Sequence, residues 1–293
     1  LIPIRSLWAQ FPQDWTSLLS WLAFLGIFLF SMLYGQRLQL MIILREVEGS
    51  LLKIKMMRDE ARKIAIDSIK EIGKPQTDPT AQVDRFLEYF ALAPVDLDPS
   101  GIIWRLEHLL DVQDLRSKDD VKLMAPQADE TQRNNLENML VWAVNLNIIY
   151  KIIRHFYLLG KKTLSLYVIM QIQMALPLIM REAEAFASGL KACQMGQPIG
   201  DGAGALVAAK LMQGYEKTKV EKDMVVAKVP LEGRTAYVLK AEGPGGNVGK
   251  PGEAMKQIIE QSEGKISLAI VVDAGLKLEG EKPGEVAEGI GVM

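Results

Sequence analysis

"WTSLLSWLAFLGIFLFSMLYGQ", Trp15 to Gln36, is a run of residues without a single charge. As one helix it would be about 33 Å long, enough to cross the hydrocarbon core of a bilayer. Trp15, Trp21 and Tyr34 lie towards its ends, where interfacial aromatic residues are common. A signal peptide has a shorter apolar centre and a small-residue cleavage site, whereas this run continues directly into a charged helical pattern. We therefore predict a single membrane-spanning helix, with a buried core helix as the alternative.

The charges on either side of this segment predict its orientation. Residues 1–14 carry only Arg5, which Asp14 opposes. The residues after the segment are rich in lysine and arginine: Arg37, Arg45, Lys53, Lys55, Arg58, Arg62 and Lys63. Because cytoplasmic flanks carry the excess of positive charge, we expect residues 1–14 outside the cell and the C-terminal bulk in the cytoplasm. The single cysteine, Cys193, agrees with a reducing compartment and excludes an intrachain disulfide.

The overall composition excludes several classes of function. The 293 residues include 34 basic and 36 acidic side chains, a net charge of −2, so no nucleic-acid partner is expected. Two histidines and one cysteine argue against a histidine-rich or thiolate metal site. The sequence has no G-x-S-x-G motif, and neither histidine has an evident nucleophile beside it, so serine hydrolase chemistry has no support.

Residues 37–73 follow the apolar segment and are predicted to form a helical stalk that ends at Gly73 and Pro75. Apolar residues recur in it at steps of four and three: Leu40, Leu44, Val47, Leu51 and Ile54. This spacing is a heptad seam, which favours association with further copies of the chain. The alternative is a helix that packs on its own domain, because Arg58 interrupts the seam after two heptads.

Residues 74–196 are predicted to be helical. Within them Leu164 to Met180, "LSLYVIMQIQMALPLIM", is apolar on almost every side. A second membrane span is one interpretation, but Gln171, Gln173 and Pro177 are costly in lipid, and basic residues flank both ends. We favour a fully buried helix, in a domain core or between subunits.

Residues 197–293 are rich in glycine and are predicted to form an α/β module. "DMVVAKVP" and "RTAYVLKAE" have the composition of two strands joined by a turn at Pro230–Gly233. A helix, "EAMKQIIEQ", and a buried strand, "ISLAIVV", which ends at Asp273, follow. The sequence closes with the glycine-rich "VAEGIGVM", and we expect the natural chain to continue or a second subunit to complete this end.

Two glycine-rich loops precede the helices of this module and are candidate anion sites, because glycine amides ahead of a helix N-terminus can bind an anion. The candidate ligand-binding residues are Gly200, Asp201, Gly202, Gly204, Gly243, Gly245, Gly246, Gly249 and Lys250. The second loop, "EGPGGNVGKPGEA", is not a Walker A loop, because Pro251 follows Lys250 and no hydroxyl is available for magnesium. It does not have the dinucleotide-binding glycine spacing either. A phosphorylated small molecule is the expected ligand, and a structural loop or an oligomer contact is the alternative.

Acidic residues near the predicted strand ends suggest a metal site. Glu242, Asp273 and Glu279 are the candidate ligands, and Mg²⁺ is the metal that oxygen donors of this kind hold. The arrangement resembles the toprim domain of topoisomerases and primases, but that pattern requires a second aspartate two positions after the first, where this chain has Gly275. A solvated acidic loop is the alternative. No catalytic residue is identified.

The single span, the helical middle and three motifs, "PIGDGAGALVAAK", "AEGPGGNVGKPGEA" and "VVDAGLKLEGEKPGEVAEG", carry a resemblance. Together they resemble an uncharacterised archaeal family of membrane-anchored proteins, described as a domain of unknown function. The resemblance covers most of the chain and implies an archaeal source. It implies no activity.

The expected architecture is α+β or α/β: an extracytoplasmic N-terminus (1–14), a transmembrane helix (15–36), a stalk (37–73), a helical domain (74–196) and a glycine-rich α/β module (197–293). The expected function is that of a membrane-anchored cytoplasmic protein that self-associates into a homo-oligomeric scaffold. The alternative is a tethered enzyme or sensor that binds a nucleotide or another phosphorylated ligand. A transporter component with Leu164–Met180 as a second span is a third possibility.

Overall fold

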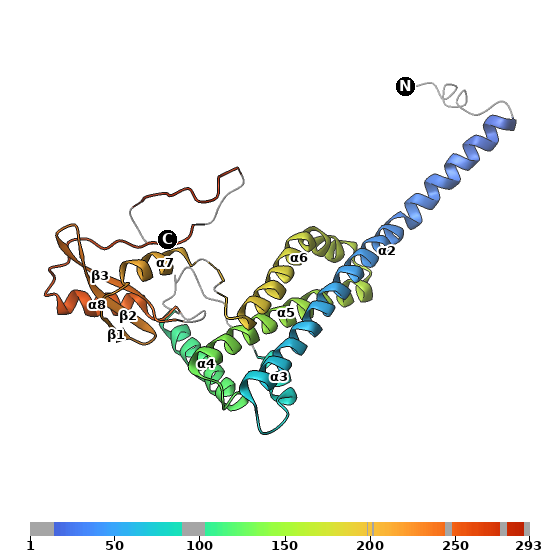
Figure 1. The fold of residues 1–293 in the computed structure, drawn as a ribbon. Coiled ribbons are helices and arrows are strands. Elements are labelled where there is room, and N and C mark those ends of the chain that lie inside the picture. Colours follow the sequence, from blue (N-terminus) through green and yellow to red (C-terminus); the bar gives the residue numbers. More distant parts are fainter. Residues whose placement is uncertain are drawn as a thin grey trace. The chain divides into compact units, whose positions relative to one another are not determined.

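The computed structural model describes residues 15–89, 103–197, 199–200, 202–243, 248–275 and 280–289 (Figure 1). It is mostly helical, with one small antiparallel sheet, and is α+β overall. The helices are α2 (Trp15–Ser68) with a π-helical end, η1 (Ile69–Gly73), then α3 (Thr80–Leu87), α4 (Ile103–Met124), α5 (Glu130–Thr163), α6 (Leu166–Gln194), α7 (Ala203–Leu211) and α8 (Pro251–Gln261). The strands are β1 (Lys217–Glu221), β2 (Met224–Leu231) and β3 (Arg234–Ala241). The chain forms two compact units, Leu1–Glu60 with Asn145–Phe186, and Ala61–Val144 with Ala187–Met293.

The first unit is built on α2, which α5 and α6 accompany as a hairpin along part of its length (Figure 1). Among the described residues, α2 is the one helix long and apolar enough to cross a membrane, and its apolar window is 0% buried. By length and composition this window fits a membrane span or a signal sequence. The helix runs without interruption from Trp15 to Ser68.

The heptad seam of the stalk is used inside the chain. Leu40, Val47 and Ile54 are buried, and Leu44 and Leu51 are half-buried. Arg58 stacks on the ring of Tyr150 in α5 at 4.1 Å from its centroid, and Gln173 of α6 donates to Glu46 at 2.5 Å. The stalk therefore packs on its own hairpin, which is the alternative that the sequence left open, and the seam is not free to pair with a second copy.

The apolar segment 164–180 is only half buried within one copy of the chain, so it is not a fully buried core helix, and burial between subunits stays a prediction. Ile169, Ile172 and Leu176 of α6 are buried, whereas the opposite face exposes Tyr167, Met174 and Leu178. The physical reason is that α2 and α5 cover one side of α6 only. Pro177 lies within the helix, on its exposed side.

The second unit contains a three-stranded antiparallel sheet in the order β1-β2-β3. The predicted strands at 223–230 and 234–242 are confirmed, and their turn is a two-residue hairpin loop, Glu232–Gly233, with φ of +50° and +78°. Pro230 lies in β2, opposite Thr235, not in the turn. Met212, Val225, Ala227 and Val229 form the core of the sheet. The predicted helix at 253–261 is confirmed as α8, which packs Ala254 and Ile258 inwards.

The prediction of an α/β module with a buried strand at 266–272 was wrong. This segment has no regular secondary structure, and Leu268, Ile270, Val271 and Val272 are exposed. Among the described residues, segment 266–272 pairs with no strand. It therefore does not form a strand, although its composition is apolar and β-branched. The sheet accordingly has no parallel pair.

The helical part of the second unit packs closely around the end of η1. An ideal Cβ on Gly73 would lie 2.6 Å from both Cα and Cβ of Ala125, and the Gln127 amide donates to the Gly73 carbonyl at 3.2 Å. The buried residues here include Val83, Phe86, Val121, Leu136 and Leu140. These contacts hold α4 and the first half of α5, which carry the polar side chains described next.

Candidate functional site

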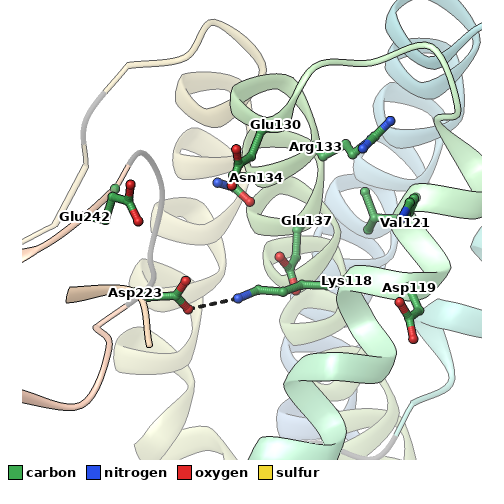
Figure 2. A pocket seen from close by; sticks show the side chains of 11 residues that line it. Lys118, Asp119, Val121, Glu130, Arg133, Asn134, Glu137, Asp223 and Glu242 are labelled. Atoms are coloured by element: carbon green, nitrogen blue, oxygen red, sulfur yellow. Dashed lines mark hydrogen bonds and ion pairs between the residues drawn. The ribbon is translucent and has the colours of Figure 1, made fainter. Parts of the chain in front are cut away.

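A polar hollow of about 270 Å³ lies in the second unit, where the last turns of α4 and the first turns of α5 meet the ends of the sheet (Figure 2). Lys118, Asp119, Val121 and Lys122 reach it from α4, and Glu130, Arg133, Asn134 and Glu137 from α5. Asp223, in the β1–β2 turn, and Glu242 and Gly243, after β3, face them. Figure 2 shows Asp223 directed at Lys118, with Glu137 beside it on α5.

Lys118 is the central cation of this hollow. Its ammonium lies 3.1 Å from a carboxylate oxygen of Asp223 and 3.3 Å from one of Asp114, which is one turn away on α4. Burial acts to lower the pKa of Lys118, but the two carboxylates outweigh it and hold that pKa above its usual value. Lys118 is therefore charged throughout the physiological range.

Glu137 is the buried carboxyl of the hollow, 8% exposed. Burial raises the pKa of Glu137, and the charges of Asp114 and Asp223 raise it further, while Ser117 and Lys118 oppose the shift. A carboxyl in this state can take up a proton more readily than an exposed glutamate.

Arg133 is less available than its position suggests. Its guanidinium donates to the carbonyl of Ala125 at 3.4 Å and to that of Pro126 at 3.1 Å, at the C-terminal end of α4. These bonds tie Arg133 of α5 to the loop that follows α4. Arg133 thus has a structural role at the rim of the hollow.

A ladder of ion pairs continues from the hollow along α4. Successive turns of α4 carry three acidic side chains, Glu107, Asp111 and Asp114. These carboxylates pair with two lysines of the C-terminal part of the chain, Lys222 and Lys250. Lys250 lies 2.9 Å from both Glu107 and Asp111. Lys222 lies 2.9 Å from Asp114 and 3.7 Å from Asp111. The hydrogen bond from Lys250 lowers the pKa of Asp111, and Asp111 in turn raises that of Lys250. The C-terminal sheet is thereby held against α4 by charge.

This ladder bears on the predicted ligand-binding loop at 243–250. Lys250, predicted to meet an anion, is engaged by two carboxylates instead. Gly249 has φ of +64°, and a Cβ there would lie 2.4 Å from the sulfur of Met224. Gly243 lines the polar hollow. Lys250 and Gly249 thus have structural uses in the chain.

The first glycine loop lies beside the segment that ends at Asp273. An ideal Cβ on Gly204, in α7, would lie 2.1 Å from the carbonyl oxygen of Val272, so glycine permits this approach. Gly202 is the N-cap of α7, and Gly200 has φ of +91°. Gly204 of this loop thus approaches the chain one residue before Asp273. The hollow that Gly243 lines does not include these residues.

Two of the predicted metal ligands, Glu242 and Asp273, lie within the described residues. Glu242 forms an ion pair with Lys219 at 2.8 Å, and Asp273 accepts a hydrogen bond from the amide of Ala274. No group of three His, Cys, Asp or Glu side chains suited to a metal occurs in the described part of the chain. Asp201, Gly245, Gly246 and Glu279 lie outside the described residues.

Comparison with known protein families gives two matches that together cover most of the sequence. A domain described as "Protein of unknown function (DUF1512) N-terminal domain" matches residues 20–196, and "Domain of unknown function (DUF1512) C-terminal" matches residues 199–293. The chain belongs to the DUF1512 family. The resemblance to a family of unknown function is therefore confirmed, while the archaeal source stays a prediction. No curated protein and no solved structure matched the chain.

The DUF1512 match shows that the polar hollow is shared by the two family domains. Lys118, Arg133 and Glu137 belong to the N-terminal domain, whereas Asp223 and Glu242 belong to the C-terminal domain. Sequence reasoning missed all three helical residues. One signal was available for Glu137, because it stands between Leu136 and the apolar Met139–Leu140 pair on a helix face that is otherwise hydrophobic.

Proposed function

We propose that this DUF1512 protein is a membrane-anchored cytoplasmic protein that self-associates into a homo-oligomeric scaffold. The anchor is the apolar part of α2. In favour of a span and against a cleaved signal sequence, the apolar window and the packed stalk are one continuous helix of 54 residues. A signal sequence is removed from the mature protein, whereas here the same helix carries the buried residues Leu40, Val47 and Ile54.

The side of the membrane follows from charge. Arg37 and Arg45 are exposed on α2 just beyond the apolar window, and further basic residues follow on the same helix. Basic flanks remain on the cytoplasmic side of a bilayer, so the C-terminal bulk belongs to the cytoplasm. Protease added outside sealed inverted vesicles should digest the C-terminal domain, and outside right-side-out vesicles it should spare it.

The observation that carries self-association is an exposed apolar stripe on α6. Tyr167, Met170, Met174 and Leu178 follow one another at intervals of three and four residues, and Met174 and Leu178 are 80% and 71% exposed. The α5 helix of the same unit also exposes Ile152, Phe156 and Leu159. Contiguous apolar surface of this kind outside a membrane span marks a protein interface, because leaving it in water is unfavourable. The same surface on a second copy is an available partner of matching chemistry.

Light scattering on the full chain in mild detergent tests this proposal. We expect a defined mass above that of one copy, and the double substitution Met174→Glu with Leu178→Glu should reduce it to that of one copy. Leu123→Glu on α4 is the control, because Leu123 is 70% exposed but belongs to another helix and another unit than the stripe, and it should leave the mass unchanged. A wild-type particle that is monomeric at all concentrations would contradict the proposal.

The alternative function, binding of a phosphorylated ligand in the glycine loops, receives no comparable support. Lys250 is neutralised by Glu107 and Asp111, and Gly204 and Gly249 serve close contacts within the chain. The hollow around Lys118 carries more carboxylates than cations, which disfavours an anion there.

A further inference from the structure

The tip of the α5–α6 hairpin, residues 161–165, combines two features that packing within the chain does not explain. Lys161 and Lys162 are both exposed and form no ion pair among the described residues. Leu164, directly after α5, is 63% exposed. It also has φ of +52°, a left-handed conformation that is unfavourable for leucine and is normally taken by glycine or asparagine at this place.

The lysines alone have a simple explanation, since cations are favourable at a helix C-terminus. Leu164 does not. Its backbone conformation is strained, and its large apolar side chain is exposed to water, and both are unfavourable. An apolar environment outside the chain would account for the exposed side chain.

The position of the tip along α2 follows from contacts within the first unit. Gln173 of α6 is bonded to Glu46 of α2. From Gln173 back to Leu164 is about 13 Å of helix, and the same distance back along α2 from Glu46 reaches Arg37. Burial along α2 agrees, because Leu40 is the first buried residue of that helix. Figure 1 shows the hairpin ending beside the middle of α2, with the part towards Trp15 standing free.

This level coincides with the surface of a bilayer. The uncharged run of α2 ends at Gln36 and is long enough to fill the hydrocarbon core, and the headgroup layer extends about 5–7 Å beyond that core. Residues Arg37 to Leu40 rise by about that distance. The hairpin tip beside them therefore lies at the depth of the lipid headgroups.

Charge identifies the kind of lipid. From Asn138 to Arg181 the sequence has no acidic residue, while Lys151, Arg154, Lys161 and Lys162 fall within it. Lys161 is held over the ring of Tyr157, 5.7 Å from its centroid, and Arg37 adds a further exposed cation from α2. Such a surface complements phosphate groups of negative charge.

We propose that the hairpin tip docks on anionic phospholipid, with Lys161 and Lys162 at the headgroup phosphates and Leu164 inserted at the boundary with the acyl chains. This contact rests on the proposed membrane anchor. It gives the first unit a second attachment to the membrane beside α2 and so fixes the orientation of this unit on the membrane surface.

A fluorescent label next to the tip tests the docking. Thr163→Cys keeps Leu164 and both lysines, and the native Cys193 is only 4% exposed, so a thiol-reactive NBD dye labels position 163 selectively. The full chain is reconstituted in vesicles of phosphatidylcholine, with or without 30% phosphatidylglycerol. We expect quenching by spin-labelled lipid, stronger in the anionic vesicles, and protection from aqueous iodide.

Neutralisation of the tip provides the matched comparison. Each lysine at an anionic surface changes the binding equilibrium roughly fivefold. Lys161→Gln with Lys162→Gln should therefore lower the ratio of docked to undocked tip about thirtyfold in the anionic vesicles. Lys53→Gln with Lys55→Gln removes the same charge from α2 about 25 Å beyond Arg37 and should have no effect.

Leu164→Gly separates a lipid role from a structural one. Glycine relieves the left-handed strain, so the unfolding temperature in detergent should rise by about 2–4 °C, while lipid quenching of the label falls. A fall in unfolding temperature would show that Leu164 packs within the chain and would overturn the proposal.

Two further outcomes would overturn the proposal in different ways. If the chain stays with the vesicles but the label remains open to iodide in both lipids, the docking is wrong and the anchor stands. If the chain does not float with the vesicles at all, the anchor is wrong and the docking falls with it. A change in oligomer mass without a change in quenching after neutralisation would assign the tip to a protein interface instead.

Discussion

Gly160→Ala is the substitution whose effect the structure of the hairpin determines most closely. Gly160 lies on α5 where α6 crosses it, and an ideal Cβ there would lie 2.2 Å from Cδ1 and 2.4 Å from Cγ1 of Ile169. Carbon atoms in contact are about 3.5–4.0 Å apart, so Ile169 must move by more than an ångström or the helices must separate. Ile169 is fully buried, so its side chain is enclosed by other atoms of the chain.

Two terms set the magnitude. Overpacking a buried contact costs about 1–3 kcal/mol, whereas alanine is better than glycine inside a helix by about 1 kcal/mol. We expect Gly160→Ala to lower the free energy of unfolding by about 1 kcal/mol net. In an Ile169→Ala background the sign should reverse, because only Cβ of residue 169 remains near, at 3.8 Å. There Gly160→Ala should stabilise by about 1 kcal/mol.

Thermal unfolding of the full chain in detergent, followed by circular dichroism, measures all four members of this cycle. Gly49→Ala is the matched control, since it is the same substitution on α2 with nothing within 4 Å, and it should stabilise in either background. If Gly160→Ala stabilises the Ile169 protein as much as Gly49→Ala does, the close crossing of α5 and α6 is refuted.

Three other predictions concern the second unit. Glu137→Gln should stabilise the protein at neutral pH. Because folding raises the pKa of Glu137, the stability that this carboxyl contributes is present at low pH and is lost as the pH rises. In unfolding curves recorded against pH, the difference between the variant and the wild type should therefore vanish below about pH 4.5. Asp111→Asn removes contacts to both Lys250 and Lys222, whereas Glu107→Gln removes one contact to Lys250. Amide hydrogen exchange in α8 and β1 should therefore increase more in Asp111→Asn than in Glu107→Gln. Equal increases would contradict the ladder of ion pairs. Gly204→Ala should displace the backbone at Val272 at a cost of about 1–3 kcal/mol and expose it to protease, whereas Gly202→Ala, with nothing within 4 Å, should not.

The elements that could be predicted from the sequence are those with a strong local signal. The length of the uncharged run at 15–36 alone predicts a long apolar helix. The β2–β3 hairpin has alternating apolar residues around a turn with Gly233, where positive φ is required. α8 begins with Pro251 at its first position, which is a common helix start.

The elements that were missed depend on partners distant in the sequence. β1, "KTKVE", has one apolar residue, and its pairing with β2 rather than its composition makes it a strand. Residues 266–272 have the composition of a buried strand but have no neighbouring strand among the described residues. Local composition cannot show which strands find a partner.

The polar hollow shows the same limit for the candidate site. The glycine loops were conspicuous in the sequence, but two of the described glycines in them, Gly204 and Gly249, serve close contacts within the chain. Lys118 and Glu137 lie on two different helices, and Asp223 comes from a turn far along the chain. Only tertiary packing brings these charges together, so no spacing in the sequence could have indicated the cluster, although the position of Glu137 on an apolar helix face could have singled out that residue.

Alkaline carbonate extraction of membranes from cells that express the full chain tests the central claim most directly. We expect the protein to remain in the membrane pellet and its intact mass still to include the apolar run of α2. Release of the protein into the supernatant, or recovery of a chain from which that run has been cleaved, would contradict it.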